Sequence, residues 1–85
     1  MLGIFSDNAE VFGNARINGN ARVVDSAKVF GNALVKDNSL VYDSAKVFGN
    51  AEISEKAEVK EVAKVLGNTK VDGHSVVHGL EFLLT

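Results

Sequence analysis

The nine residues Asp25-Ser26-Ala27-Lys28-Val29-Phe30-Gly31-Asn32-Ala33 recur unchanged from Asp43 to Ala51, 18 positions further along the chain. The inner part of this stretch, Val-Phe-Gly-Asn-Ala, also begins at Val11, and a variant, Val-Leu-Gly-Asn-Thr, begins at Val65. The four copies are therefore evenly spaced. A fixed spacing of this kind indicates a repeat architecture, in which each turn of the chain packs only on its neighbours.

A period of six residues lies within the period of 18. One position in six is a β-branched aliphatic residue, and the position two residues earlier is small, from Ala9 to Ser75. This alternation predicts short strands with one buried face, because β-branched side chains suit a pleated surface. The aliphatic column consists of Val11, Ile17, Val23, Val29, Val35, Val41, Val47, Ile53, Val59, Val65, Val71 and Val77.

Two turn-type residues follow most of the predicted strands, usually Gly-Asn, Asp-Asn or Asp-Ser. Gly and Asn tolerate a positive φ, which a tight corner requires. A helix fits the pattern poorly, because residues six apart would spiral around it at about 100° per residue instead of lining one side. Three strand-and-corner units make one turn of 18 residues. The sequence therefore predicts a triangular prism of parallel sheets, with neighbouring strands about 4.8 Å apart.

This pattern of an aliphatic residue, three variable or turn residues, a small residue and one further residue resembles the hexapeptide-repeat proteins. The resemblance runs from about Phe5 to Gly79. It implies a left-handed parallel β-helix, and the hand follows from the resemblance and not from the spacing. We expect an all-β domain over 1–85, with about four 18-residue coils over 5–79 and a C-terminal cap over 80–85. Repeats rich in Gly-Asn-Ala also look like those of uncharacterised bacterial and phage proteins.

The residue after each inward aliphatic residue points outward, and these residues form three columns of different chemistry. One column is polar, one is mixed, and one is apolar: Phe12, Phe30, Phe48 and Leu66. The apolar column is either an aromatic ladder that stabilises the stack or a surface through which copies of the chain associate. Association is the preferred interpretation, because solubility does not favour Phe at one outward position in three turns. The sequence thus predicts a structural or interaction module that forms a dimer or trimer.

Two further columns flank the apolar one. Lys28, Lys46 and Lys64 lie beside it in register. Like charges in register are unfavourable, so we expect either solvation or acidic residues of another copy. The corner after the apolar face carries Asn in all four turns, which suggests an Asn ladder, but the preferred explanation is that Asn suits a left-handed corner: Asn14, Asn32, Asn50 and Asn68.

The pattern changes at two corners and at both ends. Glu55-Lys56 and Glu61-Val62 replace the usual corner residues. Because Val62 is β-branched where a positive φ is expected, we expect a local irregularity over 55–63. The apolar ends are expected to fold over the prism as caps, or alternatively to contact another chain. The C-terminal contact residues would be Leu80, Phe82, Leu83 and Leu84.

An enzyme is the alternative, because the hexapeptide-repeat family includes acyltransferases and γ-class carbonic anhydrases. For the former the resemblance implies a His beside a pantetheine groove between subunits, and for the latter three His ligands from neighbouring coils. This chain has only His74 and His78, which make a weak metal signal without a third ligand. We predict no catalytic residue, metal, cofactor or small-molecule substrate. A fragment or degenerate relative of these enzymes is the remaining alternative.

Composition argues against several other classes. The net charge of −2, with the signs interspersed, gives no reason to expect nucleic acid or an anionic membrane as a partner. No apolar run reaches the roughly 20 residues of a spanning helix, and the first residues lack the features of a signal peptide. The default expectation for location is therefore the cytoplasm or a phage particle. There is no Cys for a disulfide, and Thr69 and Thr85 are too few for ice-binding ranks.

Overall fold

The computed structural model describes the backbone of residues 4–5, 8–79 and 82–84, and side chains over 8–79. The described backbone forms short strands and no helix. The strands are β1 (Ile4–Phe5), β2 (Glu10–Val11), β3 (Arg16–Ile17), β4 (Arg22–Val23), β5 (Lys28–Val29), β6 (Leu34–Val35), β7 (Leu40–Val41), β8 (Lys46–Val47), β9 (Glu52–Ile53), β10 (Glu58–Val59), β11 (Lys64–Leu66), β12 (Lys70–Val71), β13 (Val76–Val77) and β14 (Phe82–Leu84).

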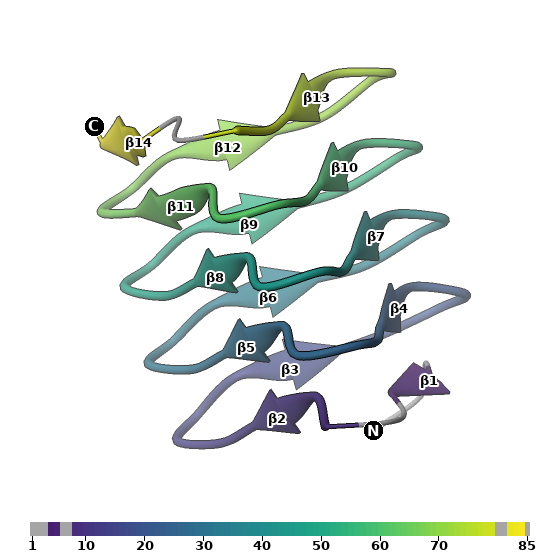
Figure 1. Ribbon diagram of the computed structural model, residues 1–85, viewed down its shortest axis with the longest axis vertical. Helices are drawn as coiled ribbons and strands as arrows, with labels where there is room; N and C mark the ends of the chain where they lie inside the picture. The colour runs from purple at the N-terminus through teal and green to yellow at the C-terminus, as the bar shows by residue number, and fades with distance from the viewer. Residues whose placement is uncertain (1–3, 6–7, 80–81, 85) are drawn as a thin grey trace.

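Every third strand joins the same parallel sheet, so the chain winds as a prism with three sides (Figure 1). We call the sheet β14-β11-β8-β5-β2 the Phe sheet and the sheet β1-β4-β7-β10-β13 the Tyr sheet; the third sheet is β12-β9-β6-β3. Val29 pairs with Val11 on one side and with Val47 on the other, an offset of 18 on each side. The predicted all-β prism of stacked coils is therefore confirmed.

The coil has a left-handed path. Followed upward in Figure 1, the chain passes from right to left through β2 in front, and from left to right through β3 behind. Crossovers between parallel strands are right-handed in most proteins. The path therefore agrees with the hand that the family resemblance implies.

The predicted aliphatic and small columns line the prism axis. Val29, Val35 and Val47 are fully buried, and each such side chain contributes about 1.5–3 kcal/mol to stability. Ser39 and Thr69 replace Ala in the small column and are also buried. Their hydroxyls donate to the carbonyls of Lys36 and Leu66, at 2.7 and 2.8 Å. Each hydroxyl thus has a partner inside the core, as burial requires.

The first residue of each corner, not the second, has the positive φ. Asp25 has φ 59° and Glu61 has φ 60°, whereas Val62 is absent from the left-handed region. The prediction of a local irregularity over 55–63 is therefore wrong. Val59 pairs with both Val41 and Val77 at the usual offset of 18. The corner after Val59 keeps its usual shape because Glu61, and not Val62, adopts the left-handed conformation.

Acidic residues at the first corner position accept hydrogen bonds from the backbone of the next turn. The carboxylate of Asp37 accepts the backbone N–H of Glu55 at 3.0 Å, and that of Asp43 accepts the N–H of Glu61 at 3.1 Å. The Glu55 carboxylate in turn accepts the N–H of Gly73 at 2.6 Å. These N–H groups would otherwise lack a partner in the stack, which gives a reason for Asp and Glu at a conformation that disfavours most side chains.

The 18-residue register continues past the region that the repeat pattern covers. Lys64 pairs with Phe82 and Leu66 with Leu84, so β14 extends the Phe sheet. At the other end, β1 pairs with β4 in the same register. Leu80 and the side chains of Phe82, Leu83 and Leu84 lie outside the described residues, so the choice between cap and end contact stays a prediction.

Candidate functional site

The outward side of the Phe sheet, which we call the Phe face, carries the predicted apolar column as a ladder of stacked rings. The ring centroids of Phe12 and Phe30 are 4.9 Å apart and those of Phe30 and Phe48 are 4.8 Å apart, with interplanar angles of 2° in both pairs. Leu66 continues the column on β11. Because the rings stack along the prism axis, they present their edges to solvent, and ring edges carry positive partial charge.

The Phe ladder is only partly covered by the chain itself. Phe12 is 49% exposed, and Phe30, Phe48 and Leu66 are half-buried. Contacts between neighbouring rungs stabilise a sheet by roughly 0.2–1 kcal/mol per pair. The ladder thus stabilises the stack, as one interpretation of the sequence proposed, and it also leaves apolar surface on the outside.

Three lysines form a second ladder on the Phe face, beside the rings. Lys28 pairs with Lys46, and Lys46 with Lys64, in adjacent strands. All three are half-buried, and over residues 8–79 none of them has an ion-pair partner. We call these three residues the Lys column. Its like charges lie one strand apart without compensation, which is unfavourable.

The corner that follows the Phe face carries a hydrogen-bonded Asn ladder. The amide Nδ2 of each Asn donates to Oδ1 of the Asn one turn on, at 3.2 Å from Asn14 to Asn32 and 3.3 Å for the next two pairs, which end at Asn68. None of these Asn residues has a positive φ. The ladder, and not a preference for the left-handed conformation, therefore explains Asn at this position.

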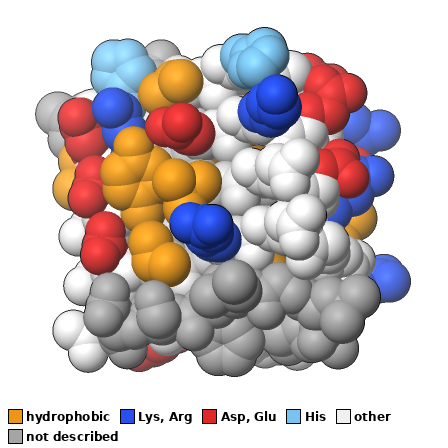
Figure 2. Space-filling model, turned by 90° about the vertical axis from the view of Figure 1, so that its right-hand side faces the viewer, with side chains coloured by type: hydrophobic (Ala, Val, Ile, Leu, Met, Phe, Trp, Pro, Cys, Tyr) orange, Lys and Arg blue, Asp and Glu red, His pale blue; other side chains and the backbone are white. Residues whose placement is uncertain are grey.

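The corner that precedes the Phe face carries acidic residues, which sequence reasoning did not single out. Asp25, Asp43 and Glu61 occupy its first position in successive turns, and we call them the acidic corner. Oδ2 of Asp25 and of Asp43 accepts the N–H of the corner residue one turn on. Figure 2 shows acidic side chains following one another up one edge of the molecule. The sequence signal that could have revealed this corner is the recurrence of an acidic residue at intervals of 18.

The outward side of the Tyr sheet is mixed, with hydrophobic side chains between charged ones (Figure 2). Tyr42 donates a hydrogen bond from its hydroxyl to Oε1 of Glu58 at 3.2 Å. Burial raises the pKa of Tyr42 above its ordinary value of 10.0, and the hydrogen bond to Glu58 and nearby negative charges raise it further. This pair was not foreseen, because Tyr42 and Glu58 belong to different columns.

We expect the Tyr42 hydroxyl to titrate above pH 10.0, measured by phenolate absorbance. A folded-state pKa above the unfolded value gives stability that is present below pH 10 or so and is lost as the pH rises through the folded pKa. Glu58→Gln should lower the midpoint without returning it to the ordinary value, because burial is the larger cause. Tyr42→Phe should remove this part of the alkaline destabilisation; an unchanged pH dependence would contradict the assignment.

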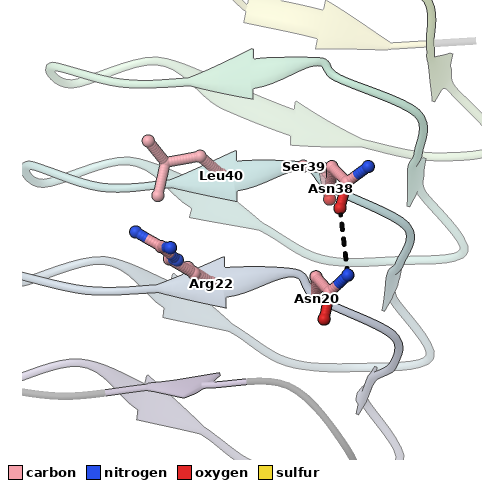
Figure 3. Close-up of a pocket in the computed structure, with 5 residues that line it drawn as sticks. All are labelled: Asn20, Arg22, Asn38, Ser39 and Leu40. Atoms are coloured by element: carbon pink, nitrogen blue, oxygen red, sulfur yellow. Dashed lines mark hydrogen bonds between the residues drawn. The ribbon is translucent and has the colours of Figure 1, made fainter.

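An open depression of about 330 Å³ lies over the corner between the third sheet and the Tyr sheet (Figure 3). Its lining includes Asn20 and Asn38, whose amides are hydrogen-bonded at 3.3 Å, and Arg22 and Leu40 on neighbouring strands. The remaining lining residue is Ser39, whose hydroxyl bonds to a carbonyl. The depression combines one cation with neutral groups, which does not make an acid–base pair for catalysis.

His74 and His78 lie on either side of β13 and are exposed. Over the described part of the chain, no three His, Cys, Asp or Glu side chains are grouped so that they could hold a metal ion. The same residues contain no helix of the length and apolarity needed to cross a membrane.

Comparison with protein-family models, with curated proteins and with solved structures finds no match for this chain. The class of protein is therefore defined by the strands and their register: a parallel β-solenoid of about four turns. The side chains on its three outer faces are the basis for any statement about function.

Proposed function

We propose that this protein is a structural module that associates with copies of itself through the Phe face, as a dimer or trimer, without catalytic activity. The observation that carries the proposal is the ladder of Phe12, Phe30 and Phe48, which lies outward in register and remains partly exposed. Contiguous exposed apolar surface marks contact sites more often than it serves a monomer. The six-residue repeat and the left-handed coil support membership of the hexapeptide-repeat superfamily.

The shape of the Phe face supports this function. Its strands follow one another at the regular offset of 18 and its rings are already stacked, so the face is ordered before any partner binds. Rigid surfaces lose little conformational entropy on association. No observation favours the alternative of a fragment or relative of the acyltransferases or carbonic anhydrases.

Phe30→Ser combined with Phe48→Ser is expected to give a folded protein of lower mass in solution. Removing the two central rings deletes apolar area at the centre of the proposed contact, where truncation costs most. Sedimentation velocity at about 0.1 mM, a concentration at which a contact with a dissociation constant of about 10 μM or less is mostly formed, measures the mass. Circular dichroism measures folding.

A matched control is Leu34→Ser combined with Leu40→Ser, which removes two half-buried outward side chains from the other two sheets. It should leave the mass unchanged. A wild-type protein that is a strict monomer would refute the proposed function. Loss of folding in the Phe variant alone would show that the ladder is intrinsic structure.

A further inference from the structure

The Lys column requires negative charge that the described part of the chain does not supply. Lys28, Lys46 and Lys64 lie in adjacent strands, and none has an ion-pair partner over residues 8–79. The edges of the neighbouring Phe rings add positive partial charge to the same surface. The Phe face is therefore an apolar surface with a cationic stripe, and its complement is a row of carboxylates.

The distance between strands in the Phe sheet fixes the spacing of the lysines. Successive members of the Lys column are one strand apart, about 4.8 Å. A partner whose charges repeat at another distance would lose register after one or two rungs. A partner that repeats at the same distance would meet every lysine.

The acidic corner has that repeat. Asp25, Asp43 and Glu61 are separated by 18 residues, as are the members of the Lys column, and each precedes one of these lysines by three positions. Oδ2 of Asp25 and of Asp43 accepts a backbone N–H, and Oδ1 of each has no partner within the described residues. The second oxygen of these carboxylates is thus available to an ammonium group.

We propose that the acidic corner of a second copy of this chain docks on the Lys column, with three carboxylates facing three ammonium groups. This inference rests on the proposed function, because it specifies how copies meet at the Phe face. The contact pairs one column of each copy with a different column of its neighbour, which a twofold axis satisfies reciprocally in a dimer and a threefold axis satisfies head to tail in a trimer. The convex corner also covers the exposed ring edges beside the lysines.

Two neutralised variants test the pairing by sedimentation equilibrium. The first removes the charge of the Lys column: Lys28→Gln, Lys46→Gln and Lys64→Gln. The second removes the charge of the acidic corner but keeps side-chain oxygens for the backbone N–H groups: Asp25→Asn, Asp43→Asn and Glu61→Gln. Each variant should weaken self-association at least about tenfold. Added salt should also weaken the self-association of the wild-type protein.

The combined variant decides whether the two columns contact each other. Groups in direct contact have non-additive effects, so neutralising both columns should weaken association no more than neutralising one. Additive effects would overturn the inference, since they would mean that each column meets a different partner group. Variants that associate as tightly as the wild type would also overturn it.

Matched controls separate pairing from total charge. Asp37→Asn with Glu55→Gln neutralises the same position at another corner, where the carboxylates make the same kind of backbone hydrogen bond. Lys36→Gln, Lys60→Gln and Lys70→Gln remove three lysines from the other two sheets. Both controls should associate as the wild type does, and an equal weakening would overturn the inference. A monomeric wild-type protein refutes the proposed function itself, whereas a salt-insensitive oligomer refutes only this pairing.

Discussion

Val35→Asp is expected to abolish folding. Val35 is fully buried in the third sheet, between Ile17 and Ile53 of the adjacent strands. The variant loses about 1.5–3 kcal/mol of apolar burial and places an unpaired carboxylate in an apolar core, at a further cost of several kcal/mol. The total is comparable with the whole stability of a small domain, about 5 kcal/mol. Far-UV circular dichroism at 25 °C should show an unfolded chain.

Leu34→Asp is the matched control for this prediction. Leu34 immediately precedes Val35 but points outward and is half-buried, with Arg16 and Glu52 as its neighbours in adjacent strands. Substitutions at such surface positions change stability by only about 0.5 kcal/mol. The variant should fold with a cooperative thermal transition. If Val35→Asp folded as well, the inward direction of the aliphatic column would be wrong.

Gly49→Ala is expected to cost about 2–5 kcal/mol, from two separate effects. Gly49 has φ +70°, and a left-handed conformation costs Ala about 1–2 kcal/mol. An added Cβ would also lie 2.8 Å from the backbone N of Gly67 in the next turn, which forces the stack apart at an overpacking cost of about 1–3 kcal/mol. Thermal denaturation followed by circular dichroism measures the loss.

Gly73→Ala separates the two effects. Gly73 has nearly the same conformation, φ +63°, but the nearest atom to an added Cβ is Oε1 of Glu55 at 3.8 Å. This variant carries the backbone cost without the collision. Since 1 kcal/mol corresponds to about 4–8 °C for a domain of this size, its melting temperature should exceed that of Gly49→Ala by at least about 5 °C. Equal melting temperatures would contradict the close approach of the turns at Gly49.

The corners show where sequence reasoning succeeded and where it failed. The positions of the corners followed from the six-residue period, and the structure places them there. Which of the two corner residues takes the positive φ did not follow, because Gly, Asn and Asp all tolerate that conformation. The error led to an expected irregularity at Val62 that is absent, since Glu61 has the left-handed φ of 60°.

The composition of the Phe face and its aromatic ladder were both foreseen, but the acidic residues beside the face were not. The period of 18 placed Phe12, Phe30 and Phe48 in one outward column, and the structure stacks their rings. The acidic corner was not singled out, because a repeat pattern does not show that a carboxylate accepts an N–H one turn away. The Tyr42–Glu58 hydrogen bond, between residues 16 apart, falls outside both periods.

By itself the sequence determined the three-sided prism, its core columns and the composition of each outer face, because a residue that must be buried in every turn has to recur at the spacing of the turn. Only the tertiary structure decided the conformation within each corner, the hydrogen bonds from carboxylates to the next turn, and the lack of an ion pair at the Lys column within residues 8–79. These features depend on how side chains in stacked turns meet. The repeat in the sequence shows which turns are adjacent, but it does not show how the side chains of adjacent turns are oriented toward each other.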